Sequence, residues 1–296
     1  MKKYEIIANP KSGNETAIDK IVQIIENMSE DGFKMDLRLT GKSGDAKEFA
    51  KEDDGEDVIV LVGGDGTLNE VVNGMIDSGK EIPLAILSGG TVNDFATAMQ
   101  IPTEVEEFCN MLKAEKIKNI DVGMAGNRKF INVAAGGMMT DIAYSVPEEK
   151  KTIFGRAAYY VEALKEVVKL GDKRNKTYFK LKVESEEYSA EEDVLAFVCA
   201  NSISVGGFEL APKATVDDGY IDVMIVKDLD LSELPMLIGN FTKGKHIEHE
   251  KVIYFQTKEV KLSTDADVTV DVDGEKAQKL PLTFNVLEKA IKLIIK

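Results

Sequence analysis

The residues best suited to chemistry form one glycine-rich turn, Gly63-Gly64-Asp65-Gly66-Thr67-Leu68-Asn69-Glu70. The apolar run at 58–62 before the turn predicts a fully buried parallel strand. The amphipathic run at 71–76 after it predicts the start of a helix. Glycines at a strand-to-helix turn let the backbone approach a ligand closely, and the free N–H groups there favour an anion, typically phosphate. The turn is therefore a candidate phosphate site.

Asp65 is the unusual member of this turn, because a carboxylate repels a phosphate group directly. A Mg²⁺ ion between the carboxylate and the phosphates would remove that repulsion. The combination of glycines and one aspartate therefore indicates nucleotide chemistry.

The elements that would position this turn alternate between strand and helix up to about residue 121. We expect strands at 4–9, 34–39, 58–62 and 83–87, and helices at 15–28, 45–52, 68–77, 91–99 and 103–112. Such alternation predicts an α/β domain with a doubly wound parallel sheet. Ligands of these sheets bind at the carboxyl ends of the strands. Four polar, glycine-containing turns fall there, at 9–13, 40–44, 63–69 and 88–94.

The second half of the chain has a different pattern. One helix is expected at 155–169, and short strands are expected at 130–135, 178–184, 194–200, 220–226, 252–256, 259–263 and 268–272. Strands separated by turns in this way predict an antiparallel β-sandwich. We therefore place a nucleotide-binding domain at 1–121 and a β-rich substrate domain at 122–285. The apolar run at 286–296 is a candidate to return to the first domain.

Composition and charge argue against several classes of protein. The chain has 296 residues, 44% hydrophobic residues and a net charge of −15, which is unfavourable for a nucleic-acid partner. Its amino terminus lacks the cleavage region of a signal peptide, and no apolar run reaches the roughly 18 residues of a membrane span. Two distant cysteines, Cys109 and Cys199, are expected to be buried thiols in a cytoplasmic protein.

One segment runs against the overall acidity. Residues 150–182 contain ten basic and three acidic residues, a local charge of 10 − 3 = +7. The segment is either a solvated surface or a face that docks on anionic lipid headgroups, with Ile153, Phe154, Tyr159 and Tyr160 entering the interface. The sequence leaves both interpretations open.

Five motifs, in order along the chain, resemble the diacylglycerol kinase catalytic domain family, and most closely its soluble bacterial branch. The family also includes sphingosine kinases and is distantly related to NAD kinase and phosphofructokinase. The motifs are Asn9-Pro10-Lys11-Ser12-Gly13, Gly63–Gly74, Gly89–Phe95, Asp217-Asp218-Gly219-Tyr220-Ile221-Asp222 and Val272-Asp273-Gly274-Glu275. The resemblance implies a phosphofructokinase-like first domain and a kinase that transfers phosphate from ATP to an alcohol with Mg²⁺.

The resemblance also implies roles for individual residues. Asp273 would be the general base, with Glu275 and Asp94 supporting the metal network. Asp218 would bind a second, structural Mg²⁺ together with the carbonyl groups of Thr215 and Tyr220. The nucleotide would contact Asn9, Pro10, Lys11, Ser12, Gly13, Thr40, Gly64, Asp65, Gly66, Thr67, Leu68, Asn69, Glu70 and Thr91.

Simpler explanations exist for several of these residues. Asp273-Gly274 between alternating strands is a strong signal for a type I′ hairpin turn, and Asp217–Gly219 fits a polar turn before a strand. His246 and His249 are too few for a zinc site, so we expect solvated surface histidines.

The expected activity is phosphorylation of diacylglycerol to phosphatidic acid by a cytoplasmic enzyme that associates peripherally with an anionic membrane. The alternatives are another lipid alcohol, such as a sphingoid base or phosphatidylglycerol, an NAD kinase-like activity, or a catalytically silent lipid sensor. The resemblance further implies a homodimer.

Overall fold

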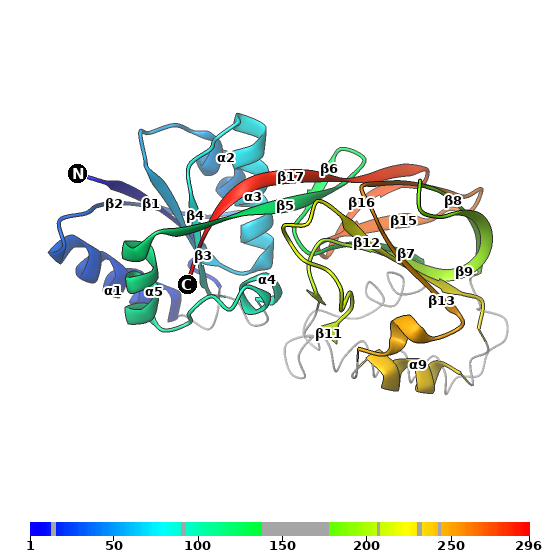
Figure 1. Ribbon diagram of the computed structural model, residues 1–296. Coiled ribbons are helices and arrows are strands. Elements are labelled where there is room, and N and C mark those ends of the chain that lie inside the picture. Colours follow the sequence, from blue (N-terminus) through cyan, green and yellow to red (C-terminus); the bar gives the residue numbers. More distant parts are fainter. Residues whose placement is uncertain (13–15, 90–92, 138–177, 206–207, 230–232, 242–243) are drawn as a thin grey trace. The chain divides into compact units, whose positions relative to one another are not determined.

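The computed structural model describes residues 1–12, 16–89, 93–137, 178–205, 208–229, 233–241 and 244–296. The chain forms two compact units (Figure 1). Unit 1 comprises Met1–Ile120 and Lys289–Lys296, and unit 2 comprises Asp121–Glu288. The sequence-based division lay at 121/122, with 286–296 as the returning segment.

Unit 1 contains the expected parallel sheet. Its strands are β1 (Lys3–Ala8), β2 (Lys34–Leu39), β3 (Val58–Gly63) and β4 (Leu84–Ser88), in the order β4-β3-β1-β2. The end of β17 (Leu282–Ile295) adds a parallel contact beside β4, where Leu293 pairs with Leu84. Every residue of β3 and β4 is buried, as expected for strands covered on both faces. The doubly wound α/β prediction is confirmed.

The described residues of this unit form five helices: α1 (Thr16–Glu30), α2 (Asp45–Lys51), α3 (Asp65–Ser78), α4 (Asp94–Ala98) and α5 (Val105–Ala114). Helix α1 packs against α5, and α2 packs against α3 (Figure 1). Helix α3 begins at Asp65, three residues earlier than predicted. Gly64, in an extended conformation, ends the turn directly before it, so most of the glycine-rich motif is helical.

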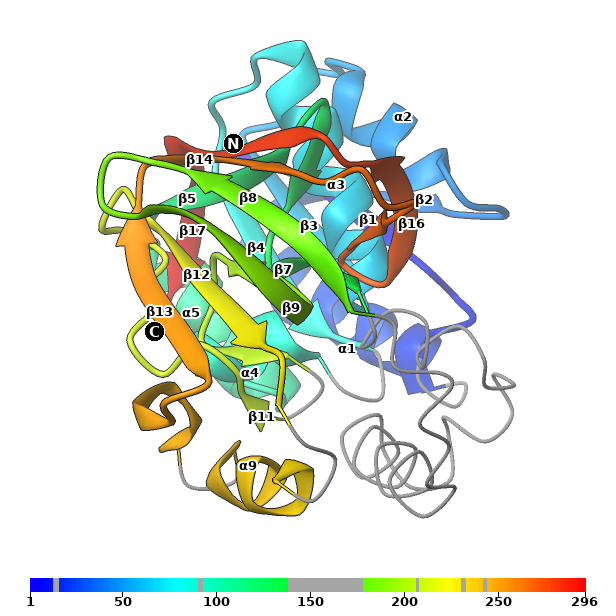
Figure 2. The same ribbon diagram turned by 90° about the vertical axis from the view of Figure 1, so that its right-hand side faces the viewer.

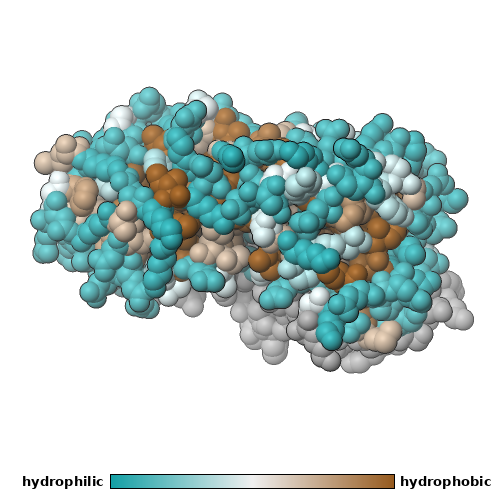
Figure 3. Space-filling model, viewed as in Figure 1, coloured by the Kyte–Doolittle hydropathy of each residue, from teal (hydrophilic) through white to brown (hydrophobic). Residues whose placement is uncertain are grey.

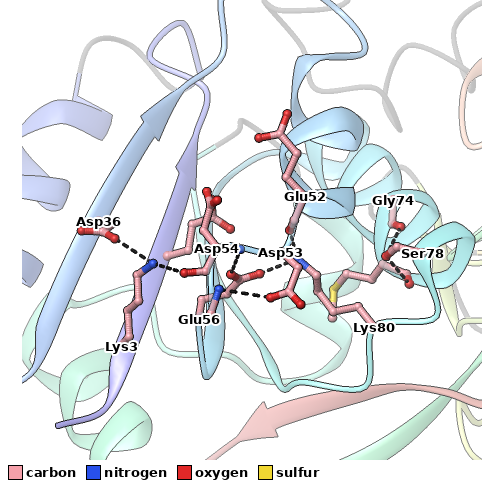
Figure 4. Close-up of polar contacts among 12 residues, drawn as sticks. Lys3, Asp36, Glu52, Asp53, Asp54, Glu56, Gly74, Ser78 and Lys80 are labelled. Carbon is pink, nitrogen blue, oxygen red and sulfur yellow. Dashed lines mark hydrogen bonds and ion pairs between the residues drawn. The ribbon is translucent and has the colours of Figure 1, made fainter.

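Charged side chains form a hydrogen-bonded network at the end of the sheet where β1, β2 and β3 begin (Figure 4). Glu56, immediately before β3, is buried and pairs with Lys80, just after α3. The Asp54 N–H donates to Glu56 Oε2 at 2.9 Å, and Lys3 Nζ lies 3.1 Å from Asp36 of β2. Buried charges need such partners, because an unpaired one would lose its hydration without compensation.

Unit 2 is the mostly antiparallel sandwich that the sequence predicted. Strand β5 (Lys116–Ala125) leads into it, followed by β6 (Arg128–Phe130) and β7 (Val133–Gly137). The other strands are β8 (Phe179–Glu184), β9 (Ser189–Ala200), β10 (Ser204–Val205), β11 (Phe208–Glu209), β12 (Ile221–Lys227), β13 (Val252–Thr257), β14 (Glu259–Ser263), β15 (Thr269–Val272) and β16 (Glu275–Lys279). Helix α9 (Leu234–Phe241) and a 3₁₀ turn at His246–Glu248 precede β13. The helix expected at 155–169 lies outside the described residues.

The long strand β9 organises this unit (Figure 2). Its first half pairs with β8, whereas its second half pairs with β7 and β12. Alternate residues enter different cores: Phe197 and Cys199 belong to one cluster, and Val198 and Ala200 belong to the other. This alternation follows from the period of two along a strand and gives the sandwich apolar packing on both faces of β9.

Candidate active site

Three loops of unit 1 meet at the carboxyl ends of adjacent strands. The N–H of Asn9, after β1, donates to Val62 of β3 at 3.0 Å, and the N–H of Gly89, after β4, donates to Gly63 O at 2.9 Å. A Cβ atom on Gly89 would lie 3.5 Å from Ser12 Cβ. Segments that are distant in sequence thus form one continuous backbone surface.

Asn9 shapes the first loop. Its Oδ1 accepts the Lys11 N–H at 3.0 Å, and its carbonyl accepts the Ser12 N–H at 3.1 Å. This side-chain-closed turn is typical of asparagine. It leaves Lys11 exposed and Pro10 and Ser12 partly exposed, and Gly13 lies outside the described residues.

The start of α3 has the features of an anion site. Gly64, the residue before the helix, makes no capping side-chain hydrogen bond. The first N–H groups of a helix have no partner within it. Among the described residues, nothing lies within 4 Å of a Cβ atom placed on Gly66. These features fit the predicted phosphate contact.

Asp65 has a structural role that the sequence did not reveal. Its Oδ2 accepts the Asp94 N–H at 3.2 Å, and its Oδ1 accepts the Phe95 N–H at 3.4 Å. The carboxylate therefore lies at the amino terminus of α4, where a negative charge is favourable. Asp94 itself is buried. Asp65 thus has a reason to be in the turn even before a metal ion is considered.

Glu70 also has protein partners. Its Oε1 accepts the Gly44 N–H at 2.8 Å and the Ser43 hydroxyl at 3.1 Å, and its Oε2 accepts the Ala46 N–H at 3.2 Å. A single side chain of α3 thus holds the loop that leads into α2. Thr40 begins this loop, and its N–H donates to Ala8 O at 2.9 Å.

The remaining predicted contacts of α3 differ in exposure. Leu68 is buried, and its N–H donates within the helix to Gly64 O, so its observed role is packing. Asn69 accepts a hydrogen bond from Asn73 Nδ2 at 2.9 Å, and Thr67 is half-buried. Thr91 lies outside the described residues.

In unit 2, Asp273 occupies the predicted hairpin turn between β15 and β16. Asp273 and Gly274 both have positive φ, 50° and 92°, as a type I′ turn requires. Few residues other than glycine adopt this conformation, and aspartate is one of the more tolerant. The turn prediction is correct.

The Asp273 carboxylate makes three hydrogen bonds to backbone amides. Its Oδ2 accepts the Ile131 N–H at 2.7 Å, and its Oδ1 accepts those of Asn132 at 3.0 Å and Val133 at 2.9 Å. Such donors stabilise an ionised carboxylate and hold it in one orientation. Asp273 is therefore both a turn residue and a fixed anionic group.

A buried amide holds the segment that contacts Asp273. Asn201 Nδ2 donates to the carbonyl groups of Asp121 and Ile131, both at 3.0 Å. The Asn201 N–H donates to Asn132 O at 2.9 Å, and Ser202 Oγ donates to Asn132 Oδ1 at 2.8 Å. Neither residue belongs to a motif identified in the sequence, although Asn201-Ser202 directly follows the strand expected at 194–200.

The turn at 215–220, the candidate second metal site, packs against Asp121. The Gly219 N–H donates to the buried Asp121 carboxylate at 2.7 Å, and the Asp121 N–H donates to Val216 O at 2.6 Å. Asp218 and Thr215 are exposed, and Asp218 Oδ1 accepts the Tyr220 N–H at 3.0 Å. One exposed carboxylate among carbonyl groups is an oxygen donor set that suits Mg²⁺ with bound water.

Asp222 lies just behind this turn and is buried. Tyr254 and Gln256 both donate to its carboxylate, the latter at 3.3 Å. Burial is the largest effect and raises the pKa of Asp222 to about 6. In the part of the chain that the structure describes, this turn included, no three His, Cys, Asp or Glu side chains form a group that would hold a metal ion.

Comparison with known proteins shows the family to which the chain belongs. Residues 3–125 match the diacylglycerol kinase catalytic domain, and residues 133–295 match the YegS C-terminal NAD kinase beta sandwich-like domain. A diacylglycerol kinase of Staphylococcus carnosus (strain TM300) is 34% identical over 295 residues, which cover 99% of this chain and 94% of the relative. The chain belongs to the diacylglycerol kinase family.

Other relatives agree with this assignment. A diacylglycerol kinase of Staphylococcus aureus (strain JH9) is 34% identical over 293 residues, 98% of this chain and 91% of the relative. The crystal structure of a diacylglycerol kinase from Bacillus anthracis str. Sterne has a TM-score of 0.82 and 25% sequence identity. That comparison covers 100% of this chain and 97% of the other. This member of the family is therefore a lipid kinase that uses ATP and transfers phosphate to an alcohol.

Some predictions for this diacylglycerol kinase family member need correction or stay open. His246 is buried, not a surface residue: its Nε2 lies 2.9 Å from Leu210 O, and burial lowers its pKa. Most of the basic segment at 150–182 lies outside the described residues. The two described lysines in it form surface ion pairs, Lys180 with Glu191 and Lys182 with Glu184.

The two cysteines of this family member match expectation. Cys109 and Cys199 are buried free thiols, and burial raises the pKa of both. None of the helices in the described ranges combines the length and apolar composition that a membrane crossing requires.

Proposed function

We propose that this enzyme transfers the γ-phosphoryl group of ATP to the free hydroxyl of diacylglycerol and forms phosphatidic acid. The observation that carries the proposal is the extent of similarity to proteins named diacylglycerol kinase, 34% identity over 99% of the chain. The similarity covers unit 2 as well as the nucleotide loops, and the family resemblance assigns the acceptor to unit 2.

Asp273 is the proposed general base. Its carboxylate takes the proton of the acceptor hydroxyl, the oxygen attacks the γ-phosphorus, and the bond to the leaving ADP oxygen breaks. The three N–H donors at 2.7–3.0 Å support this role because they hold the carboxylate in one orientation. The positive φ of the turn fixes the backbone that carries it.

The nucleotide is proposed to bind at the loops after β1, β3 and β4 and at the start of α3. The backbone N–H groups there bind phosphate oxygens, and the open space at Gly66 allows their approach. Asp65 and Asp94 are the proposed ligands or positioning groups for Mg²⁺. When bound, Mg²⁺ neutralises charge on the phosphates as the phosphoryl group transfers.

A second Mg²⁺ is proposed at the turn formed by residues 215–220. Asp218 supplies the carboxylate, and Thr215 and Tyr220 supply carbonyl groups. Its role there would be structural. The Asp121 carboxylate accepts the Gly219 N–H of this turn, and the Asp121 carbonyl group accepts a hydrogen bond from Asn201.

The acceptor is identified by a competition of substrates. Labelled ATP is supplied with mixed micelles of diacylglycerol, a sphingoid base or phosphatidylglycerol, and with NAD as a soluble control. We expect labelled phosphatidic acid as the main product. A labelled product from another lipid would reassign the acceptor, and labelled NADP without labelled lipid would overturn the lipid kinase proposal.

We further propose that the enzyme works in the cytoplasm at the surface of an anionic membrane. The basic segment at 150–182, with its local charge of +7, supports this because the rest of the chain is acidic. Its attraction to anionic headgroups would be on the order of 1 kcal/mol per basic residue.

A further inference from the structure

The segment at 131–133 leads from β6 into β7 and is held by two distant parts of unit 2. The Asp273 carboxylate accepts its three N–H groups. Asn201, directly after β9, donates to two of its carbonyl groups. Asn201 lies 70 positions after Ile131, and Asp273 lies 142 positions after it. Tertiary packing therefore brings both residues to one short segment.

Two consecutive peptide groups of this segment connect Asn201 to Asp273. In the first, the Ile131 carbonyl group accepts Asn201 Nδ2 at 3.0 Å. The N–H of the same peptide group belongs to Asn132 and donates to Asp273 Oδ1 at 3.0 Å. In the second, the Asn132 carbonyl group accepts the Asn201 N–H at 2.9 Å, and the Val133 N–H donates to the same Oδ1 at 2.9 Å. Each peptide group thus has Asn201 at its oxygen and Asp273 at its hydrogen.

The planarity of the peptide group couples these two contacts. The C=O and N–H bonds of a trans peptide group lie in one plane and point in opposite directions. Holding the oxygen therefore also sets the direction of the N–H bond. Asn201 accordingly determines where the N–H groups of Asn132 and Val133 point, and these N–H groups hold Asp273 Oδ1.

The surroundings of the Asn201 side chain favour this role over simple core packing. The side chain is 1% exposed, and its Nδ2 also donates to the Asp121 carbonyl group at 3.0 Å. Its Oδ1 is buried and accepts no hydrogen bond from the residues that the structure describes. A buried polar atom without a partner costs stability, and an apolar side chain would avoid that cost. The amide is therefore better explained by the carbonyl groups that it holds.

Ser202, the next residue along the chain, supports the same segment. It is fully buried, and its Oγ donates to Asn132 Oδ1 at 2.8 Å. Asn132 is 5% exposed, so this bond is shielded from water. The residues after β9 thus hold both the carbonyl group and the side chain of Asn132.

We propose that Asn201 is a positioning residue for the Asp273 carboxylate and acts through these two peptide groups, with Ser202 as a second support. The inference rests on the proposed role of Asp273 as general base. A base must lie within hydrogen-bond reach of the hydroxyl, and a displacement of about 1 Å can lower the rate by about 10²-fold. An uncharged amide fixes the peptide groups without adding a charge near the carboxylate.

Steady-state kinetics on the full chain, with MgATP and the lipid that the substrate competition identifies, test this role. Asn201→Ala removes the side-chain amide and keeps the backbone N–H. We expect kcat to fall by roughly 10- to 100-fold. KM for MgATP should change little, since the proposed nucleotide contacts lie in unit 1. A kcat equal to that of the natural chain would overturn the proposal.

Thr257→Val is the matched control for loss of a buried polar group in unit 2. Thr257 is 1% exposed, and its Oγ1 donates to Glu259 O at 2.9 Å. This control should lose stability and keep its kcat. Ser202→Ala is a milder second variant, for which kcat should fall by about twofold to tenfold. If Asn201→Ala does not fold, an unchanged kcat in Ser202→Ala would refute the role.

A double-mutant cycle separates positioning from stability. In a chain that already carries Asp273→Asn, Asn201→Ala should lower kcat no further, because the group that it positions no longer accepts a proton. An equal loss in both backgrounds would overturn the positioning role and leave Asp273 as the base. Natural activity in Asp273→Asn would instead refute the base, and this inference with it.

Hydrogen exchange tests the geometry independently of catalysis. The amides of Asn132 and Val133 should exchange at least about tenfold faster in Asn201→Ala than in Thr257→Val, because their peptide groups lose a fixed oxygen. Mass spectrometry of the fragment covering 130–134 measures this difference. Equal exchange in the two variants would contradict the proposed link between Asn201 and Asp273.

Discussion

At the scale of single residues, the carboxylates of this enzyme each have partners within the chain. Asp65 accepts the N–H groups that begin α4, Glu70 accepts those before and within the first turn of α2, and Asp273 accepts three from the segment at 131–133. Each carboxylate is fixed before any ligand binds. Fixed charges need no reorganisation during the reaction, which is the condition for efficient electrostatic catalysis.

Asp273→Asn should lower kcat by roughly 10²–10⁴-fold, because an amide cannot accept the hydroxyl proton. ATP affinity should change little, since the proposed nucleotide contacts lie in unit 1. The measurement is steady-state kinetics alongside ATP binding by calorimetry. Asp271→Asn is the matched control, because Asp271 also accepts a turn N–H, that of Gly274 at 2.8 Å. Activity like that of the natural chain in Asp273→Asn would remove it from catalysis.

The raised pKa of Asp222 predicts that the stability of the folded protein depends on pH. Its pKa is raised from 3.8 to about 6, chiefly by burial. Below pH 4 the Asp222 carboxyl group is mostly protonated in both the folded and the unfolded protein, so the folded state has its highest stability there. As the pH rises through 6, this stability is lost, because the unfolded protein ionises the group more readily than the folded protein does. Between pH 4 and pH 7, the unfolding free energy of the natural chain should fall by roughly 2 kcal/mol relative to Asp222→Asn.

Denaturant titrations in the presence of a chelator, at several pH values, measure this difference for Asp222. The exposed Asp228 provides the control substitution, Asp228→Asn. Parallel pH profiles for the natural chain and Asp222→Asn would show that the burial effect is absent.

At the scale of elements, α3 uses its glycines for two different purposes. A Cβ atom on Gly74 would lie 2.3 Å from Lys47 O and 2.9 Å from Ala50 Cβ, so this glycine allows α2 and α3 to pack closely. A Cβ atom on Gly66 would meet nothing within 4 Å. One glycine therefore serves the fold, and the other leaves space at the proposed ligand surface.

The two substitutions should separate stability from binding. Gly74→Ala should lower the unfolding free energy by about 1–3 kcal/mol, because α2 must move away. Gly66→Ala should keep or raise stability by up to about 1 kcal/mol, since alanine is the better helix former. It should nevertheless weaken MgATP binding, measured by calorimetry. Unchanged ATP affinity in Gly66→Ala would argue against phosphate binding at the start of α3.

At the scale of the whole molecule, the chain combines strong acidity with one basic segment. The net charge is −15, and the face in Figure 3 is mostly hydrophilic with apolar residues in small groups. Net charge of this size keeps a protein soluble but opposes contact with an anionic surface. Binding to a membrane that holds the lipid substrate would therefore depend on the segment at 150–182.

Replacing Lys165, Lys169, Arg174 and Lys176 by glutamine should weaken binding to anionic vesicles by roughly 1 kcal/mol per residue. The salt dependence of binding should decrease in parallel, because fewer charge contacts remain to be screened. Vesicle co-sedimentation at several salt concentrations measures both effects. Neutral vesicles are the control, and unchanged binding would mean that the segment is only a solvated surface.

The order of elements, the parallel sheet, the sandwich and the turns at the carboxyl ends of the strands could all be predicted from the sequence. These features follow from local patterns: a run such as 58–62 is apolar enough to specify a buried strand, and Asp273-Gly274 specifies its own turn. Family resemblance then added the proposed chemistry. The expected start of this helix, residue 68, lies three residues after the observed start at Asp65, because apolar periodicity does not mark the first helical N–H groups.

The groups that the Asp65 and Asp273 carboxylates contact could be found only from the tertiary structure. Asp65 meets residues 29 and 30 positions away, and Asp273 meets residues 140 to 142 positions away. His246 is also buried, and its Nε2 lies 2.9 Å from the carbonyl oxygen of Leu210, 36 positions away. Hydrogen bonds between such distant residues depend on how the sheets bring loops together, and no local pattern in the chain encodes that arrangement.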